Sequence, residues 1–177
     1  MKKIVLIYGL IAGLLCAGVL GVSGILNSGS LNFEYGMYFG FTSMILAAVI
    51  IWFGMASYKK NNGGTISFGK AFKIGFLMTL IASSMYVFTW MALYNSAFKG
   101  FGEKYAAYQI ETLKKSGKSE AEIAKASEKT KEDMALYDGN PLYRAAVTYM
   151  EILPLQVLIV LIASAVLSRR KKPQPAM

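Results

Sequence analysis

The stretch YKKNNGGTISFGKAFK, residues 58–73, carries four lysines and no acidic residue, and it lies between two long uncharged segments. Cytoplasmic loops of membrane proteins carry an excess of lysine and arginine. The stretch therefore predicts a cytoplasmic link between two membrane-spanning helices. The rest of the chain can be oriented from this link.

The composition is that of an integral membrane protein. The 177 residues are 55% hydrophobic and 16% charged, whereas soluble domains are roughly 25% charged. We therefore expect a single integral membrane domain over residues 1–172, with the lipid bilayer as its first partner. A short disordered tail is expected at 173–177.

Four segments are apolar and long enough to cross a bilayer. A helix rises ~1.5 Å per residue, so ~20 residues cross a hydrocarbon core of ~30 Å. The first segment could also be a cleaved signal peptide, but its uncharged run exceeds the ~7–15 residues typical of such peptides. The sequence thus predicts an all-α fold, a bundle of four transmembrane helices. The predicted spans cover residues 4–26, 36–58, 74–98 and 145–167.

Residues 99–144 form an insertion of a different kind, in which acids and bases alternate at nearly equal number. A first helix is predicted over 102–116, ending at Gly117, because glycine commonly follows a helix C-terminus. Ser119 and Glu122 have the spacing of a capping box, which predicts the start of a second helix that stops near 138–141. The two narrow apolar faces predict a helical hairpin whose helices pack on each other or on the membrane surface, or contact a partner protein.

The cations are distributed asymmetrically. Ten of the 19 lie at the N-terminus, at residues 58–73 and at the C-terminal cluster, and the other nine are matched by all ten acids. Four spans bring these three places to one side, so both termini are predicted to be cytoplasmic and the insertion extracytoplasmic. The positive charge is thus a topology signal, and we expect no nucleic-acid partner.

The basic residues expected at the membrane surface can be ordinary topology anchors, or they can recognise anionic lipid specifically. We favour the anchor interpretation. They are Lys59, Lys60, Lys70, Lys73, Arg169, Arg170, Lys171 and Lys172.

Small residues recur every fourth position in the first span, at Gly9, Gly13, Ala17 and Gly21. This spacing places them on one helix face, where another backbone can approach closely. Packing within the protein's own bundle is the favoured interpretation. A homo-oligomer formed through the same face is the alternative.

Two acids lie near the spans, Glu34 and Glu151, and both fall in or near the outer leaflet by topology. A carboxylate at membrane depth is costly and indicates function by default. One hypothesis is a titrating pair or cation site formed with Asn95 and Tyr149. The alternative is that Glu34 lies among the head groups, that Glu151 pairs with Arg144 or a tyrosine hydroxyl, and that both only stabilise helix packing.

The chain contains no histidine and one cysteine, which argues against imidazole or thiolate metal sites. No nucleophile elbow or phosphate-binding glycine loop is present, since Gly63 and Gly64 precede no Lys-Ser or Lys-Thr pair. We therefore expect no enzyme activity, no cofactor and no metal.

Several motifs occur in a familiar order: EYG at 34–36, GGTISFGKAFKIG at 63–75, NP at 140–141 and EILP at 151–154. Together they resemble the domain of unknown function 4199, a family of small four-span proteins found mainly in bacteria of the Bacteroidota. The resemblance extends from about Lys2 to Lys172. It implies a bacterial inner-membrane protein and assigns no catalytic residue.

Two functions follow as hypotheses. The first is a non-enzymatic membrane scaffold or accessory subunit whose insertion, 99–144, meets a periplasmic protein partner. The second is a small oligomeric transporter or channel component that uses Glu34 and Glu151.

Overall fold

The computed structural model describes residues 1–26 and 33–169, apart from the side chains of Leu26 and Glu34. The predicted tail, the basic residues Arg170, Lys171 and Lys172, and the link at 27–32 lie outside the described residues. Within the described ranges the chain forms six α-helices and no strand. The helices are α1 (Lys2–Leu26), α2 (Phe33–Asn61), α3 (Phe68–Tyr94), α4 (Phe101–Lys114), α5 (Glu120–Gly139) and α6 (Pro141–Ser168).

Four of these helices, α1, α2, α3 and α6, are long and apolar enough to cross a membrane. This confirms the all-helical fold and the four predicted apolar segments. The helices are longer than those segments, because polar end residues continue the same backbone. The largest difference is in α3, which begins at Phe68 and ends at Tyr94, whereas its apolar segment was predicted at 74–98.

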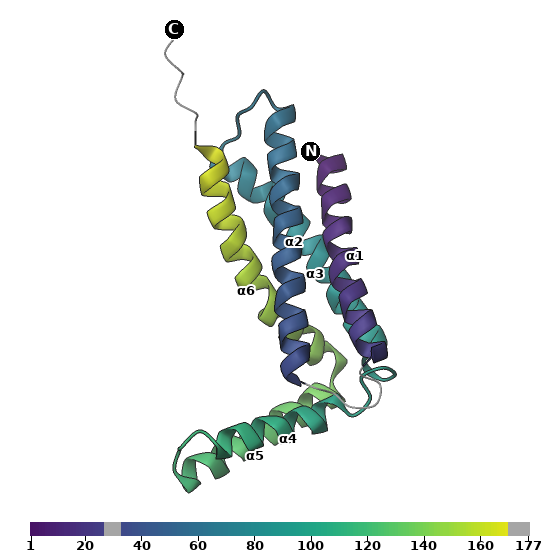
Figure 1. Ribbon diagram of the computed structural model, residues 1–177, viewed down its shortest axis with the longest axis vertical. Helices are drawn as coiled ribbons and strands as arrows, with labels where there is room; N and C mark the ends of the chain where they lie inside the picture. The colour runs from purple at the N-terminus through teal and green to yellow at the C-terminus, as the bar shows by residue number, and fades with distance from the viewer. Residues whose placement is uncertain (27–32, 170–177) are drawn as a thin grey trace.

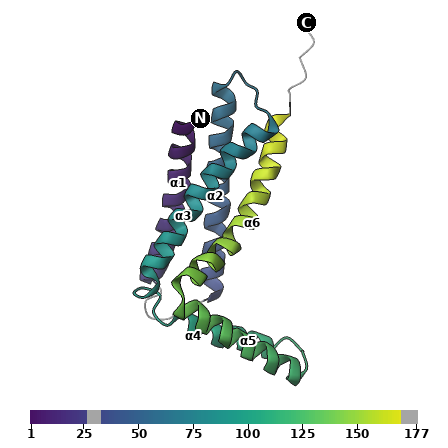
Figure 2. The same cartoon turned by 180° about the vertical axis from the view of Figure 1, so that it is seen from behind.

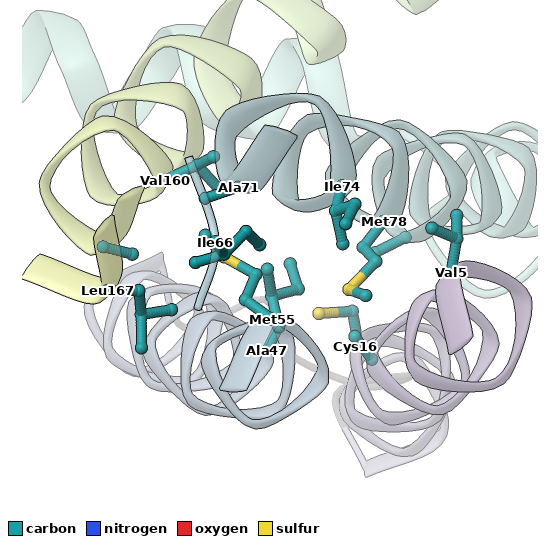
Figure 3. Close-up of a cluster of buried hydrophobic side chains, with 14 residues drawn as sticks. Val5, Cys16, Ala47, Met55, Ile66, Ala71, Ile74, Met78, Val160 and Leu167 are labelled. Atoms are coloured by element: carbon teal, nitrogen blue, oxygen red, sulfur yellow. The ribbon is translucent and has the colours of Figure 1, made fainter. Parts of the chain in front are cut away.

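The four long helices pack into one bundle (Figure 1). Helix α1 contacts α3 and α2 most extensively, and α3 contacts α6. The bundle core contains small and flexible side chains, and Figure 3 shows Cys16, Met55 and Met78 pointing toward the centre between the helices. The exterior is also apolar, because many large hydrophobic side chains are exposed on it, for example Leu14, Phe53, Phe88 and Ile162.

Helices α4 and α5 lie side by side and extend from one end of the bundle at an angle to its axis (Figures 1 and 2). The N-terminus, the link between α2 and α3 and the C-terminal end of α6 lie at the opposite end. The three basic regions identified in the sequence are therefore attached to the same end of the molecule.

Local sequence signals decide the ends of α4 and α5. Gly117 adopts a φ of +72° after α4, a conformation that glycine accepts without strain. The Ser119 side chain accepts from the Glu122 amide, and the Glu122 carboxylate accepts from the Ser119 amide. The predicted capping box is thus confirmed. Asn140 caps α6 by accepting from the amides of Leu142 and Tyr143.

Ser67 immediately precedes α3, but its side chain makes no hydrogen bond to the first turn of the helix. The aromatic residues that follow it stack at intervals of one turn, with ring centroids 6.4 Å apart for Phe68 and Phe72. Phe72 and Phe76 lie 5.8 Å apart. The segment is part of the continuous helix α3.

Candidate functional site

The residues predicted to share a polar site are not joined to one another in the part of the chain that is described. Glu151 is exposed on α6, and Asn95 is exposed at the end of α3. Tyr149 instead donates a 2.9 Å hydrogen bond to Ser84 on α3. The Glu34 side chain lies outside the described residues, so a site that includes it stays a prediction.

Arg144 was considered only as a possible partner of Glu151, and the structure gives it a different environment. The residue is 3% exposed, and its guanidinium carbon lies 3.7 Å from the ring centroid of Tyr94. Its Nη2 donates a 3.3 Å hydrogen bond to the carbonyl oxygen of Asp138. Within the described residues it forms no ion pair with Glu151. A cation over an aromatic face gains more when it is desolvated, and here that contact joins α6 to α3.

A second set of contacts joins the same helices to α5. The indole Nε1 of Trp90 donates a 2.8 Å hydrogen bond to the Tyr137 hydroxyl. That hydroxyl also lies 3.3 Å from Oγ1 of Thr148, and the Tyr94 hydroxyl donates to the Asp138 carboxylate. We call this set the α3–α5–α6 junction. Its members are Trp90, Tyr94, Tyr137, Asp138, Arg144 and Thr148.

Burial and hydrogen bonding act in opposite directions on Tyr137. Burial is the largest effect and raises the pKa of the phenol above its ordinary value of 10.0, although hydrogen bonds with Thr148 and Trp90 act in the opposite direction. The phenol is therefore neutral at physiological pH and can accept from Trp90. No signal in the sequence indicated that Trp90, Tyr94 and Tyr137 meet, because α3 and α5 lie far apart in the chain.

Aromatic packing extends the junction to α4 and α2. The ring centroids of Trp90 and Phe101 lie 4.9 Å apart, and those of Phe33 and Phe101 lie 5.7 Å apart. Phe101 begins α4 and Phe33 begins α2. The side-by-side helices α4 and α5 are thus held by three of the four long helices.

The middle of the bundle contains a cavity of only about 20 Å³. Two buried oxygens on its wall, Thr79 Oγ1 and Gln156 Oε1, have no hydrogen-bond partner in the described structure. The Gln156 amide is oriented by a 2.9 Å hydrogen bond from Nε2 to the carbonyl of Met44. A water molecule needs about 10–15 Å³ of such volume, so the cavity has room for one or two waters and for no larger ligand.

A much larger cavity of about 930 Å³ lies at the opposite end from α4 and α5. Three of the predicted membrane-surface cations line it, namely Lys59, Lys60 and Arg169. Lys70 and Lys73 are exposed on α3 and do not line it. The fold therefore separates these basic residues into two groups that the sequence could not distinguish.

The structure also separates the small residues of α1 into those packed closely against α3 and those that are not. A Cβ added at Gly9 would lie 3.1 Å from Cβ of Ile81, and one at Gly13 would collide with the Met85 side chain. At Gly21 an added Cβ would meet nothing within 4 Å. Gly9 and Gly13 thus allow close packing of α1 on α3, while Ala17 is partly buried and Gly21 is open.

The described residues contain no group of three or more His, Cys, Asp or Glu side chains placed to hold a metal ion.

Comparison with known proteins gives one result. A family model described as "Protein of unknown function (DUF4199)" matches residues 7–169. No curated protein and no solved structure is significantly similar to the chain.

Proposed function

We propose that the chain, which belongs to the family described as protein of unknown function (DUF4199), is a non-enzymatic scaffold or accessory subunit of a bacterial inner membrane. In this proposal its four long helices cross the bilayer and helices α4 and α5 form a rigid platform on the periplasmic side. A periplasmic protein is the expected partner of that platform.

Two observations support the membrane placement. The outer surface of the bundle is lined by exposed apolar side chains, which is costly in water and favourable in lipid. The basic regions belong to one end of the bundle, and α4 and α5 extend from the other. By the excess of cations in cytoplasmic loops, the basic end faces the cytoplasm.

The observation that carries the scaffold role is the α3–α5–α6 junction. A flexible insertion would not need a buried arginine, a hydrogen-bonded tryptophan and a tyrosine–aspartate pair to hold it. Ordering these groups costs conformational entropy, which their contacts offset only if the geometry is kept. The junction thus holds α4 and α5 in a fixed direction relative to the spans.

The surface of the platform is suited to polar contacts. The apolar residues along α4 and α5 are partly buried where the two helices pack together, as at Ile110, Leu113, Ile123 and Met134. The remaining positions present lysines and acids in nearly equal number. The platform therefore carries no strong net charge, and a partner is expected to recognise it through local charge pairs.

Transport through Glu34 and Glu151 is less well supported by the described residues. The central cavity has room for about two waters at most. A transported solute would need this interior to open.

Membrane placement can be tested with single cysteines. Cys16 is the one cysteine of the chain and is buried. The Cys16→Ser variant therefore provides a background without thiols. Lys118→Cys, between α4 and α5, is expected to react with an impermeant maleimide in whole cells, whereas Asn62→Cys is expected to react only after lysis. The reverse pattern would overturn the orientation.

The platform role can be tested by photo-crosslinking in cells. A photoreactive residue at Lys125 or Lys129, both exposed on α5, is expected to give one protein adduct of defined mass. The same residue at Phe88, exposed on the bundle, serves as the control and is expected to give no such adduct. Absence of protein adducts from all exposed positions of α5 would contradict the proposal.

A further inference from the structure

The cavity of about 930 Å³ lies where the end of α2, the start of α3 and the end of α6 meet. Its position in the fold brings together residues that are more than 100 positions apart in the chain. Its lining residues are Ala56, Lys59, Lys60, Asn62, Gly64, Thr65, Ile66, Ser67, Phe68, Ser168 and Arg169.

The electrostatics of this cavity have a single sign. Its described lining residues include three cations, Lys59, Lys60 and Arg169, and no acid. Lys59 is held in place, because its ammonium donates a 2.6 Å hydrogen bond to the carbonyl of Leu167 at the end of α6. Lys60 and Arg169 are exposed and can turn toward a ligand. Like charges that share a concave surface repel one another, and an anion between them relieves that repulsion.

The start of α3 adds hydrogen-bond donors to the lining of the cavity. Ser67 and Phe68 line the cavity, and Ser67 makes no side-chain hydrogen bond to the first turn of the helix. The first backbone amides of a helix have no partner within the helix and carry part of the positive end of its dipole. Such amides favour a bound anion. Here they act together with the three side-chain cations that line the same cavity.

The lining of the cavity also includes apolar side chains, those of Ala56, Ile66 and Phe68. A ligand that fits it therefore combines a compact anionic group with a less polar part. The backbone of the link permits this shape, since Gly63 and Gly64 adopt φ values of +70° and +76° that other residues rarely accept.

We propose that this cavity is a binding site for a phosphate ester. The phosphate oxygens accept from Lys60, from the planar guanidinium of Arg169 and from the first amides of α3, while the apolar lining residues contact the esterified group. This chemistry occurs in the head group of an anionic phospholipid and in soluble phosphate esters. The site does not depend on the scaffold role or on a partner protein.

Lys70 and Lys73 supply a matched control. They lie on α3 within two turns of the cavity, are exposed and do not line it. Replacing them by glutamine removes the same charge from the same end of the molecule. If anions are attracted only by the general positive charge of this end, both double substitutions weaken binding equally. If the cavity is a specific site, only substitution of Lys60 and Arg169 weakens it.

The experiment uses the purified full-length protein in a nonionic detergent at physiological salt. Binding of short-chain phosphatidylglycerol, short-chain phosphatidylcholine and glycerol 3-phosphate is followed by native mass spectrometry or by ligand-induced thermal shift. Three proteins are compared: wild type, Lys60→Gln/Arg169→Gln and Lys70→Gln/Lys73→Gln. Circular dichroism confirms that all three fold.

We expect saturable binding of phosphatidylglycerol, weakened about tenfold or more in Lys60→Gln/Arg169→Gln and less than about twofold in Lys70→Gln/Lys73→Gln, as the loss of charge-assisted hydrogen bonds implies. Saturation by glycerol 3-phosphate with the same variant pattern would support the site and assign a soluble ester as its ligand. Equal weakening by both double variants, or no saturable binding of either anion, would overturn the proposal. Phosphatidylcholine binding at wild-type strength in all three proteins would also overturn it.

Discussion

The indole nitrogen of Trp90 donates a 2.8 Å hydrogen bond to the hydroxyl of Tyr137, which joins α3 to the last turn of α5 across 47 residues of sequence. The acceptor is 5% exposed and the donor residue 7% exposed, so neither group can exchange this bond for water. This contact belongs to the α3–α5–α6 junction. The contact therefore fixes the direction of α4 and α5 relative to the bundle of long helices.

Removing the Tyr137 hydroxyl is expected to destabilise the protein. Tyr137→Phe leaves the Trp90 indole N–H buried without an acceptor, which costs about 1–3 kcal/mol in unfolding free energy. Tyr105→Phe is the matched control, since the Tyr105 hydroxyl accepts a hydrogen bond from Gln109 on the same helix, and Gln109 is more exposed to solvent than Trp90. Thermal unfolding in detergent measures both. Equal effects of the two variants would show that the Trp90–Tyr137 bond contributes nothing specific.

The small residues of α1 are expected to differ in their tolerance of a large side chain. Gly13→Leu inserts atoms into the contact with Met85 and Ala82 on α3, which costs about 1–3 kcal/mol through overpacking. Gly21→Leu meets open space and is expected to change stability by less than about 0.5 kcal/mol.

Light scattering of the same two variants tests the alternative role of this face. If α1 also forms a homo-oligomer through its open small residues, Gly21→Leu changes the oligomeric state. A change confined to Gly13→Leu, with unfolding at lower temperature, supports packing within the bundle. An unchanged stability of Gly13→Leu would contradict the close packing of α1 on α3.

The central cavity predicts whether a substitution on its wall raises or lowers the unfolding free energy. Thr79 Oγ1 and Gln156 Oε1 both line it, and one water could satisfy both. Thr79→Val is then expected to lower the unfolding free energy by about 1 kcal/mol, because the water loses a partner. A gain in stability would show instead that the hydroxyl is buried in a dry cavity.

Thr89→Val on the same helix is the control for that measurement. The Thr89 hydroxyl donates to the carbonyl of Met85 one turn earlier, and this carbonyl also has its helical partner available. The change in unfolding free energy is expected to stay within about 0.5 kcal/mol.

The start of α5 is expected to loosen in acid. Hydrogen bonds from Ser119 hold the pKa of Glu122 below its ordinary value of 4.5. A carboxyl whose pKa is lower in the folded helix stabilises that helix above its ordinary pKa, and the contribution disappears as the pH falls through the folded-state value. Amide hydrogen exchange at the first turn of α5 should therefore accelerate on acidification. Glu122→Gln removes this pH dependence, whereas Glu120→Gln, which is outside the capping box, should retain it.

Features with local causes could be predicted from the sequence. The presence of four apolar helices follows from uncharged runs, and the end of α4 follows from Gly117. The start of α5 follows from Ser119 and Glu122, whose hydrogen bonds cross only three positions. The start of α6 at Pro141 was not predicted, since the fourth span was expected from residue 145, although its cap Asn140 is an equally local signal. Each of these signals acts within one or two turns of the helix that it shapes, so no knowledge of the neighbours is needed.

Contacts between distant elements could not be predicted. Lys59 donates to the Leu167 carbonyl, 108 positions away, whereas Lys70, beside the same link, makes no such bond to the described residues. Arg144 lies over Tyr94 instead of pairing with Glu151, because α6 turns Arg144 inward and Glu151 outward. The rotation of each helix about its axis decides such pairs.

The sequence by itself determined the number and approximate position of the apolar helices, the segregation of the cations to three regions and the helical caps of the insertion. Only the tertiary structure decided which side chains meet at the α3–α5–α6 junction and which cations share a cavity. The physical reason lies in the four long helices themselves. Helices that are apolar on every side carry little periodicity to mark an inner face, so their orientation is set by close packing of shapes such as Gly13 against Met85.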